Sequence, residues 1–101
     1  RVTAMIQVRC TPQKEQGFDH IAEQIYRYPE VRDCYLMSGG FDLMLIVCCK
    51  SLKEVAMFVS EKVSRIDAVT GTETLFILKN YKMNGIEFDL QNLDHRETII
   101  L

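Results

Sequence analysis

The chain has no apolar run near the roughly 20 residues that a membrane span requires. Residues 1–9 alternate apolar and polar side chains, which is unlike the continuous apolar core of a secretory signal peptide. Both absences predict a cytoplasmic protein with no membrane partner. The length of 101 residues suits one globular domain and disfavours two separate cores.

An excess of positive charge is also missing. The sequence holds 12 Lys and Arg against 14 Asp and Glu, a formal net charge of −2. A surface so evenly charged has no field that would gather phosphates. We therefore expect no binding of nucleic acid by this chain alone.

Metal-binding and phosphate-binding motifs are absent as well. The sequence has no C-x-x-C pair, no Gly-rich phosphate loop, and no cluster of cysteine and histidine among Cys10, Cys34, Cys48, Cys49, His20 and His95. In a reducing compartment such cysteines are ordinarily small buried hydrophobes. Cys48 and Cys49 are expected to point to opposite faces of a strand, which disfavours a disulfide between them. We expect no metal, no cofactor and no catalytic residue.

Hydrophobic periodicity predicts four strands and two helices. Apolar side chains recur at every second position over residues 2–10, which predicts a strand. Thr11 and Pro12 are suited to the N-cap and first position of a helix over residues 12–28. The remaining strands are expected over residues 31–37, 42–49 and 69–78.

The second helix begins at a capping box. Ser51 accepts from the backbone of Glu54, and the Glu54 side chain reaches back to Ser51. The buried stripe of this helix is expected to hold Leu52, Val55, Ala56, Val59, Val63 and Ile66.

The order of elements is one strand-helix-strand unit used twice. This order predicts an α+β ferredoxin-like fold, a βαββαβ (split βαβ) sandwich in which both helices cover one face of an antiparallel sheet. The other face would then expose an apolar patch that is unusual on a monomer, comprising Met5, Tyr35, Met44 and Ile46. We therefore predict an isologous dimer that forms through the sheets.

The composition changes after Lys79. Residues 80–101 hold two basic and four acidic side chains, so this segment carries the whole net charge. Asn84 and Gly85 form a strong hairpin-turn signal. We predict a domain over residues 1–79 and a hairpin and arm over residues 80–101, whose apolar end at 98–101 suggests a strand that pairs with a neighbouring chain.

The segment with the most chemical information is Ser38-Gly39-Gly40-Phe41-Asp42. Consecutive glycines leave backbone N–H groups open to a carboxylate, and Asp42 offers a carboxylate to an ammonium group. That pairing suits an amino acid. The alternative is a strand-joining turn in which Asp42 caps its own backbone.

Thr72 and Thr74 place hydroxyl groups on one face of the last predicted strand. They are candidates for the same ligand site, although threonine is also simply a good strand former. His20 and His95 have no Ser or Cys partner in a catalytic arrangement, so we interpret them as surface residues.

Four segments at matching spacing resemble the effector-binding domain, also called the RAM domain, of the leucine-responsive and asparagine-responsive (Lrp/AsnC) transcription regulators. These segments are residues 2–8, 28–31, 38–45 and 72–75. The resemblance covers about four-fifths of the chain, over residues 2–79. Phe41 stands where many members have Tyr, which puts a hydroxyl contact there in doubt. The tail beyond Lys79 is similar to extensions of some members, more weakly.

The resemblance implies a sheet-to-sheet homodimer, further assembly into rings that are commonly octamers, and amino acids bound where dimers meet. It assigns Gly39, Gly40, Phe41 and Asp42 to the effector loop, with Thr72 and Thr74 completing the cleft from another subunit. Family members bind DNA through a helix-turn-helix that precedes the first strand, and this chain contains none. We therefore expect either an excised sensing domain or a stand-alone member.

Two other functions remain open on the sequence. The same fold plan serves dimeric α/β-barrel enzymes such as small haem-degrading monooxygenases, for which only His20 or His95 offers the usual axial imidazole. A pure assembly module with an empty cleft is the third interpretation. The leading hypothesis is an amino-acid-sensing and oligomerisation domain that is not an enzyme.

Overall fold

The structure, a computed structural model, describes residues 1–88. Its elements in chain order are β1 (Val2–Cys10), α1 (Asp19–Tyr26), β2 (Val31–Leu36), β3 (Leu43–Cys49), α2 (Leu52–Phe58), the π-helical turn η1 (Val59–Val63), β4 (Val69–Phe76), β5 (Lys82–Met83) and β6 (Ile86–Glu87). The predictions made for His95 and for residues 98–101 fall outside the described residues. The division of the chain after Lys79 stays a prediction.

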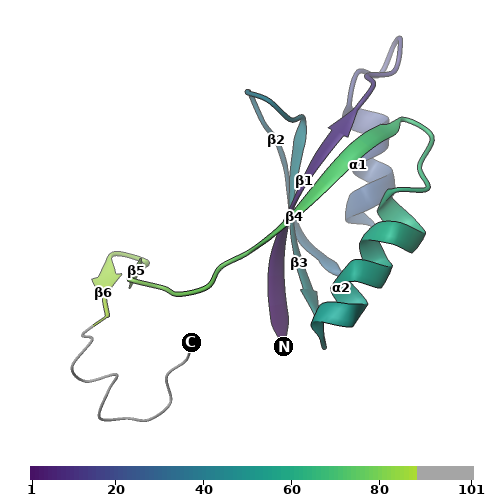
Figure 1. Cartoon of the computed structure of the whole chain (residues 1–101). Helices are drawn as coiled ribbons and strands as arrows, with labels where there is room; N and C mark the ends of the chain where they lie inside the picture. The colour runs from purple at the N-terminus through teal and green to yellow at the C-terminus, as the bar shows by residue number, and fades with distance from the viewer. Residues whose placement is uncertain (89–101) are drawn as a thin grey trace.

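β1 to β4 form one antiparallel sheet in the order β2-β3-β1-β4. Both helices lie on one side of this sheet (Figure 1). The predicted α+β ferredoxin-like fold is therefore confirmed. We call the side away from the helices the open face.

A single core fills the space between the sheet and the helices. Alternate residues of β1 and β3 point into it because successive strand side chains alternate between faces. The buried set is Ala4, Ile6, Val8, Cys10, Ile21, Ile25, Leu43, Leu45, Val47, Cys49, Val55, Phe58 and Val63. No charged or polar residue is buried in this part of the chain.

The first helix is shorter than predicted. It begins at Asp19, because residues 13–17 form a closed turn in which Gln13 and Gly17 exchange backbone hydrogen bonds of 2.7 and 2.9 Å. Gly17 has φ 60°, a left-handed conformation that suits glycine and interrupts a helix. Thr11 donates its N–H to the carbonyl of Ala68 instead of capping a helix. The expected start at Pro12 was therefore wrong.

The second helix follows its capping box. The N–H of Glu54 donates to the Ser51 hydroxyl at 3.1 Å, while the Glu54 carboxylate accepts from the N–H of Lys50 at 3.0 Å, one residue before the expected partner. The buried stripe was partly wrong. Leu52 and Ala56 are exposed, because the side of the helix that faces the sheet is centred on Val55 and Phe58.

The turn η1 is fastened to the segment before β2. Lys62 Nζ lies 2.8 Å from Glu30 Oε2 and 5.2 Å from the ring centroid of Tyr28. The hydrogen bond to Glu30 raises the pKa of Lys62. This contact ties the end of the second helix to the chain that enters the edge strand β2.

The difference in burial between two leucines tests the packing of the core. Leu45 is 0% exposed and Leu52 is 60% exposed. Leu45→Ala removes buried methyl groups and leaves a cavity, so it should lower the free energy of unfolding by about 2–5 kcal/mol. Leu52→Ala should cost less than about 1 kcal/mol, as measured by urea denaturation. Equal losses in the two variants would contradict the packing described here.

Candidate functional site

The loop between β2 and β3 is tied at both ends to the sheet. The N–H of Met37 donates to the carbonyl of Asp42 at 2.8 Å, and the N–H of Asp42 donates to the carbonyl of Val8 at 3.0 Å. Gly39 has φ 130°, a conformation that side chains rarely adopt. The Gly-Gly segment is thus a fixed turn at the end of the sheet, with Ser38, Gly39 and Gly40 exposed and Phe41 half-buried.

Asp42 holds the end of a neighbouring strand. Its Oδ2 accepts the backbone N–H of Cys10 at 2.9 Å. Among residues 1–88, Oδ2 is the Asp42 carboxylate oxygen that has a hydrogen-bond partner, which leaves Oδ1 available. Asp42 therefore does cap backbone, but that of β1 rather than its own. Its expected role toward an ammonium group stays a prediction.

Cys10 is a partner that sequence reasoning missed. Burial, together with the nearby carboxylate of Asp42 and the thiol of Cys34, raises the pKa of the Cys10 thiol to about 11. This thiol is therefore protonated at neutral pH and behaves as a small apolar side chain. The antiparallel pairing of β3 with β1 could have revealed this partner, because it brings the start of β3 beside the end of β1.

Thr72 and Thr74 lie on β4, on the other side of β1 from the loop. Thr72 is the register partner of Val8, and Thr74 is that of Ile6. Val8 also pairs with Leu43, the residue after Asp42. The loop and Thr72 therefore flank the same end of β1, about two strand spacings or roughly 10 Å apart. Thr74 lies farther along the sheet.

The four residues predicted for a dimer interface share the open face. Met5 pairs with Ile46, and Tyr35 pairs with Met44. Residues directly opposite in antiparallel strands share a face, and these positions alternate with the buried core positions. Leu75, which the sequence did not single out, pairs with Met5 and belongs to the same surface.

Other candidate chemistry is sparse in the described residues. His20 is exposed on α1, and residues 1–88 contain no group of three metal-ligating side chains. A groove of about 500 Å³ between α1 and η1 is lined mostly by polar side chains, including Gln24, Glu61 and Arg65, and its lining includes neither the loop nor the threonines. Over the described residues, no helix has the length and apolar character of a membrane span.

Comparison with known proteins assigns the family. The family model of the Lrp/AsnC ligand binding domain matches residues 3–86. The chain is 50% identical over 95 residues to the uncharacterized HTH-type transcriptional regulator YugG of Bacillus subtilis (strain 168), with 94% of this chain and 57% of the relative covered. The chain spans about half the length of the curated relatives it matches.

Solved structures share the fold. TTHA0845 from Thermus thermophilus has a TM-score of 0.70 and 25% identity, covering 82% of this chain and 100% of that chain. The transcriptional regulator NMB0573 from Neisseria meningitidis, solved as a complex with L-Met, has a TM-score of 0.73 and 23% identity, covering 91% of this chain and 58% of that chain. The second likeness concerns the fold alone.

The matched relatives are named transcriptional regulators, and the matched domain is a regulatory one rather than a catalytic one. The haem-degrading alternative has no support among them. The chain belongs to the Lrp/AsnC ligand-binding domain family.

Proposed function

We propose that this domain binds an amino acid at the loop of residues 38–42 and regulates transcription in response. The observation that carries the proposal is the carboxylate of Asp42. It is held by Cys10 through Oδ2, and Oδ1 is available beside an exposed Gly-Gly turn. A carboxylate fixed in this way can bind an ammonium group with little further loss of side-chain conformational entropy.

The neighbouring groups suit the rest of an amino acid. Gly39 and Gly40 are exposed and have open space where a Cβ would stand, so a ligand carboxylate can approach their backbone N–H groups closely. The hydroxyl groups of Thr72 and Thr74 are proposed to reach the ligand from another subunit, because Thr72 of the same chain lies about two strand spacings from the loop. The regulator NMB0573, which shares the fold, was solved with L-Met bound. That ligand belongs to the same chemical class as the one proposed here.

The open face supports a proposal for the oligomeric state. Met5, Met44, Ile46 and Leu75 are only half-buried in one copy, and Tyr35 is half-exposed beside them. Covering this surface with the same surface of a second copy removes apolar area from water, and a two-fold axis makes the two surfaces identical. We propose a sheet-to-sheet dimer and further assembly to an octamer, with Thr72 and Thr74 of another subunit completing each ligand cleft.

We propose that a part of the regulator outside this domain binds DNA. The described domain has no basic surface excess, whereas relatives such as YugG are named HTH-type regulators and are longer than this chain. We propose that a helix-turn-helix on the N-terminal side of β1 contacts DNA in the cytoplasm, while this domain senses the effector.

The effector site is tested by removing one charge. Asp42→Asn keeps an oxygen that can accept the Cys10 N–H but loses the negative charge. Each of the twenty common L-amino acids is first screened by thermal shift, and those that stabilise the protein are titrated by calorimetry. We expect Asp42→Asn to weaken binding by about tenfold or more, because a hydrogen bond to a charged group contributes roughly 1.5–3 kcal/mol.

The matched control is Asp67→Asn, which removes one exposed carboxylate from the turn before β4. It should leave affinity unchanged. Equal affinity of Asp42→Asn and the unmodified protein would overturn the site, and no stabilisation by any of the twenty amino acids at millimolar concentration would overturn the ligand class.

The open face is tested with two methionines. Met44→Glu puts a charge on the open face, and the two-fold symmetry doubles its effect in a dimer. We expect light scattering to show that this variant is a monomer, and we expect its circular dichroism spectrum to match that of the unmodified protein. Met57→Glu, on the exposed side of α2, should leave the oligomer intact. An unmodified protein that is monomeric at micromolar concentration, or an intact Met44→Glu dimer, would refute the interface.

A further inference from the structure

The hairpin of β5 and β6 has one apolar side and one charged side. Lys82 pairs with Glu87, and Met83 pairs with Ile86. Directly opposite residues of a hairpin share a side, and successive pairs alternate. Tyr81, which precedes Met83 by two residues, therefore belongs with Met83 and Ile86. We call these three residues the apolar side of the hairpin.

This apolar side is exposed within the described structure. Tyr81 is 66% and Ile86 is 65% exposed. Asn84 and Gly85, with φ 53° and 79°, form a tight turn that defines the register of the hairpin. A two-stranded hairpin is at best marginally stable alone in water. An amphipathic hairpin of this kind needs a surface on which its apolar side can pack.

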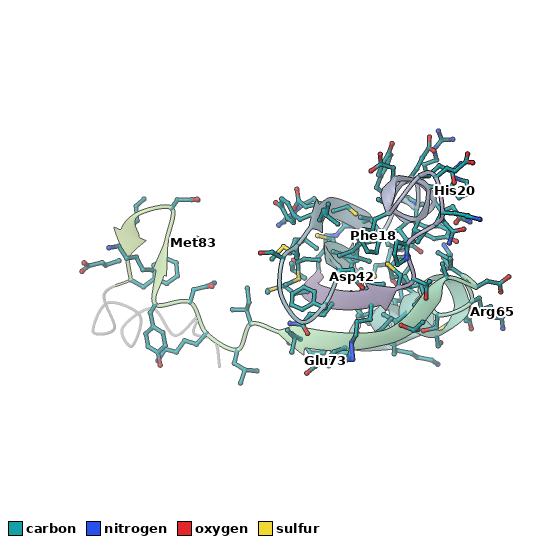
Figure 2. All side chains as sticks on the ribbon, turned by 90° about the horizontal axis from the view of Figure 1, so that it is seen from above. Phe18, His20, Asp42, Arg65, Glu73 and Met83 are labelled. Carbon is teal, nitrogen blue, oxygen red and sulfur yellow. The ribbon has the colours of Figure 1, made fainter. Side chains whose placement is uncertain are left out.

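The segment before the hairpin carries it away from the sheet. Residues 77–80 run outward from the end of β4, and the hairpin stands apart from the body of the domain (Figure 1). Figure 2 shows the same separation from above, with Met83 far from Asp42 and Glu73. Leu78 in this segment is 84% exposed. No close packing of the hairpin on its own sheet is therefore seen in the described residues.

The segment is long enough to reach a second sheet. Four extended residues span about 13 Å, and sheets packed face to face lie about 10 Å apart. The alternation along β4 also continues into the segment. Glu73 and Leu75 share the open face with Gln7 and Met5, and Ile77 follows in the same series. The arm thus extends the surface proposed to meet a second copy.

We propose that the apolar side of the hairpin packs against a second copy of this chain, so that each subunit of the sheet-to-sheet dimer clasps the other. This inference rests on the dimer proposed above. The projected area of the open face is roughly 500 Å², and its accessible surface is somewhat larger because side chains project from it. Stable interfaces bury about 800 Å² per partner. Reciprocal packing of two hairpins supplies additional apolar area in a symmetric dimer.

The test changes one side of the hairpin at a time. The double variant Met83→Lys with Ile86→Glu makes the apolar side charged while keeping an attractive cross-strand pair, so the hairpin itself is preserved. We expect the dimer dissociation constant, measured by analytical ultracentrifugation, to rise by about tenfold or more. The matched control, Lys82→Glu with Glu87→Lys, reverses the charged pair on the other side and should leave that constant within about threefold. An unchanged constant in the Met83 and Ile86 variant would overturn the clasp.

A cross-link identifies the partner directly. Tyr81→benzoylphenylalanine should give a covalent dimer on irradiation of the full chain, and absence of a dimer band would contradict packing on a second copy. If Met44→Glu dissociates the dimer while the Met83 and Ile86 variant does not, the clasp fails and the sheet interface stands. If the unmodified chain is monomeric, both fail together.

Discussion

The structure depends on a sheet that is covered by helices on one face only. The buried positions of β1 and β3 form the core with both helices, and the positions between them point the other way. A strand such as β3, with Leu45 buried and Met44 and Ile46 on the opposite side, is apolar on both faces. One face is covered by the helices of the same chain, and we propose that a second copy covers the other. The composition, 48% hydrophobic overall, is thus divided between an internal core and an open face.

The proposed ligand site is attached to the same sheet. Asp42 directly precedes β3 and holds the end of β1 through Cys10, and both strands carry residues of the open face. A ligand bound at Asp42 would therefore contact strands that also form the proposed interface. This arrangement offers a short physical route between effector binding and assembly, because both involve the same two strands. Coupling of this kind requires that the ligand bind one assembled state more tightly than another.

Much of the fold could be predicted because its signals are local. Alternation in β1, the apolar run of β3 and the capping box at Ser51 each need only neighbouring residues to be recognised. The errors came from contacts between distant segments or from backbone conformation. The start of α1 was misplaced because the turn at Gly17 and the bond from Thr11 to Ala68 compete with a helix that the local sequence allows. Which side of α2 is buried, here the side with Phe58, depends on how the helix packs on the sheet.

The candidate site shows the same limit. Gly39, Gly40 and Asp42 were recognisable from their spacing, whereas the role of Cys10 depends on a bond across 32 residues of sequence. The charged and apolar sides of the hairpin were readable only once its register was known. The ligand, the dimer and the clasp stay predictions, because each involves groups outside this chain.

Whether the open face meets a second copy can be measured by an isotope-filtered NOE experiment. Chains carrying ¹³C-labelled Met and Ile methyl groups are mixed with unlabelled chains, so that only contacts between copies are detected. A sheet-to-sheet dimer predicts intermolecular NOEs from the methyl groups of Met5, Met44 and Ile46. Intermolecular NOEs confined to Met57 on the helix layer, or none from the open face at all, would contradict it.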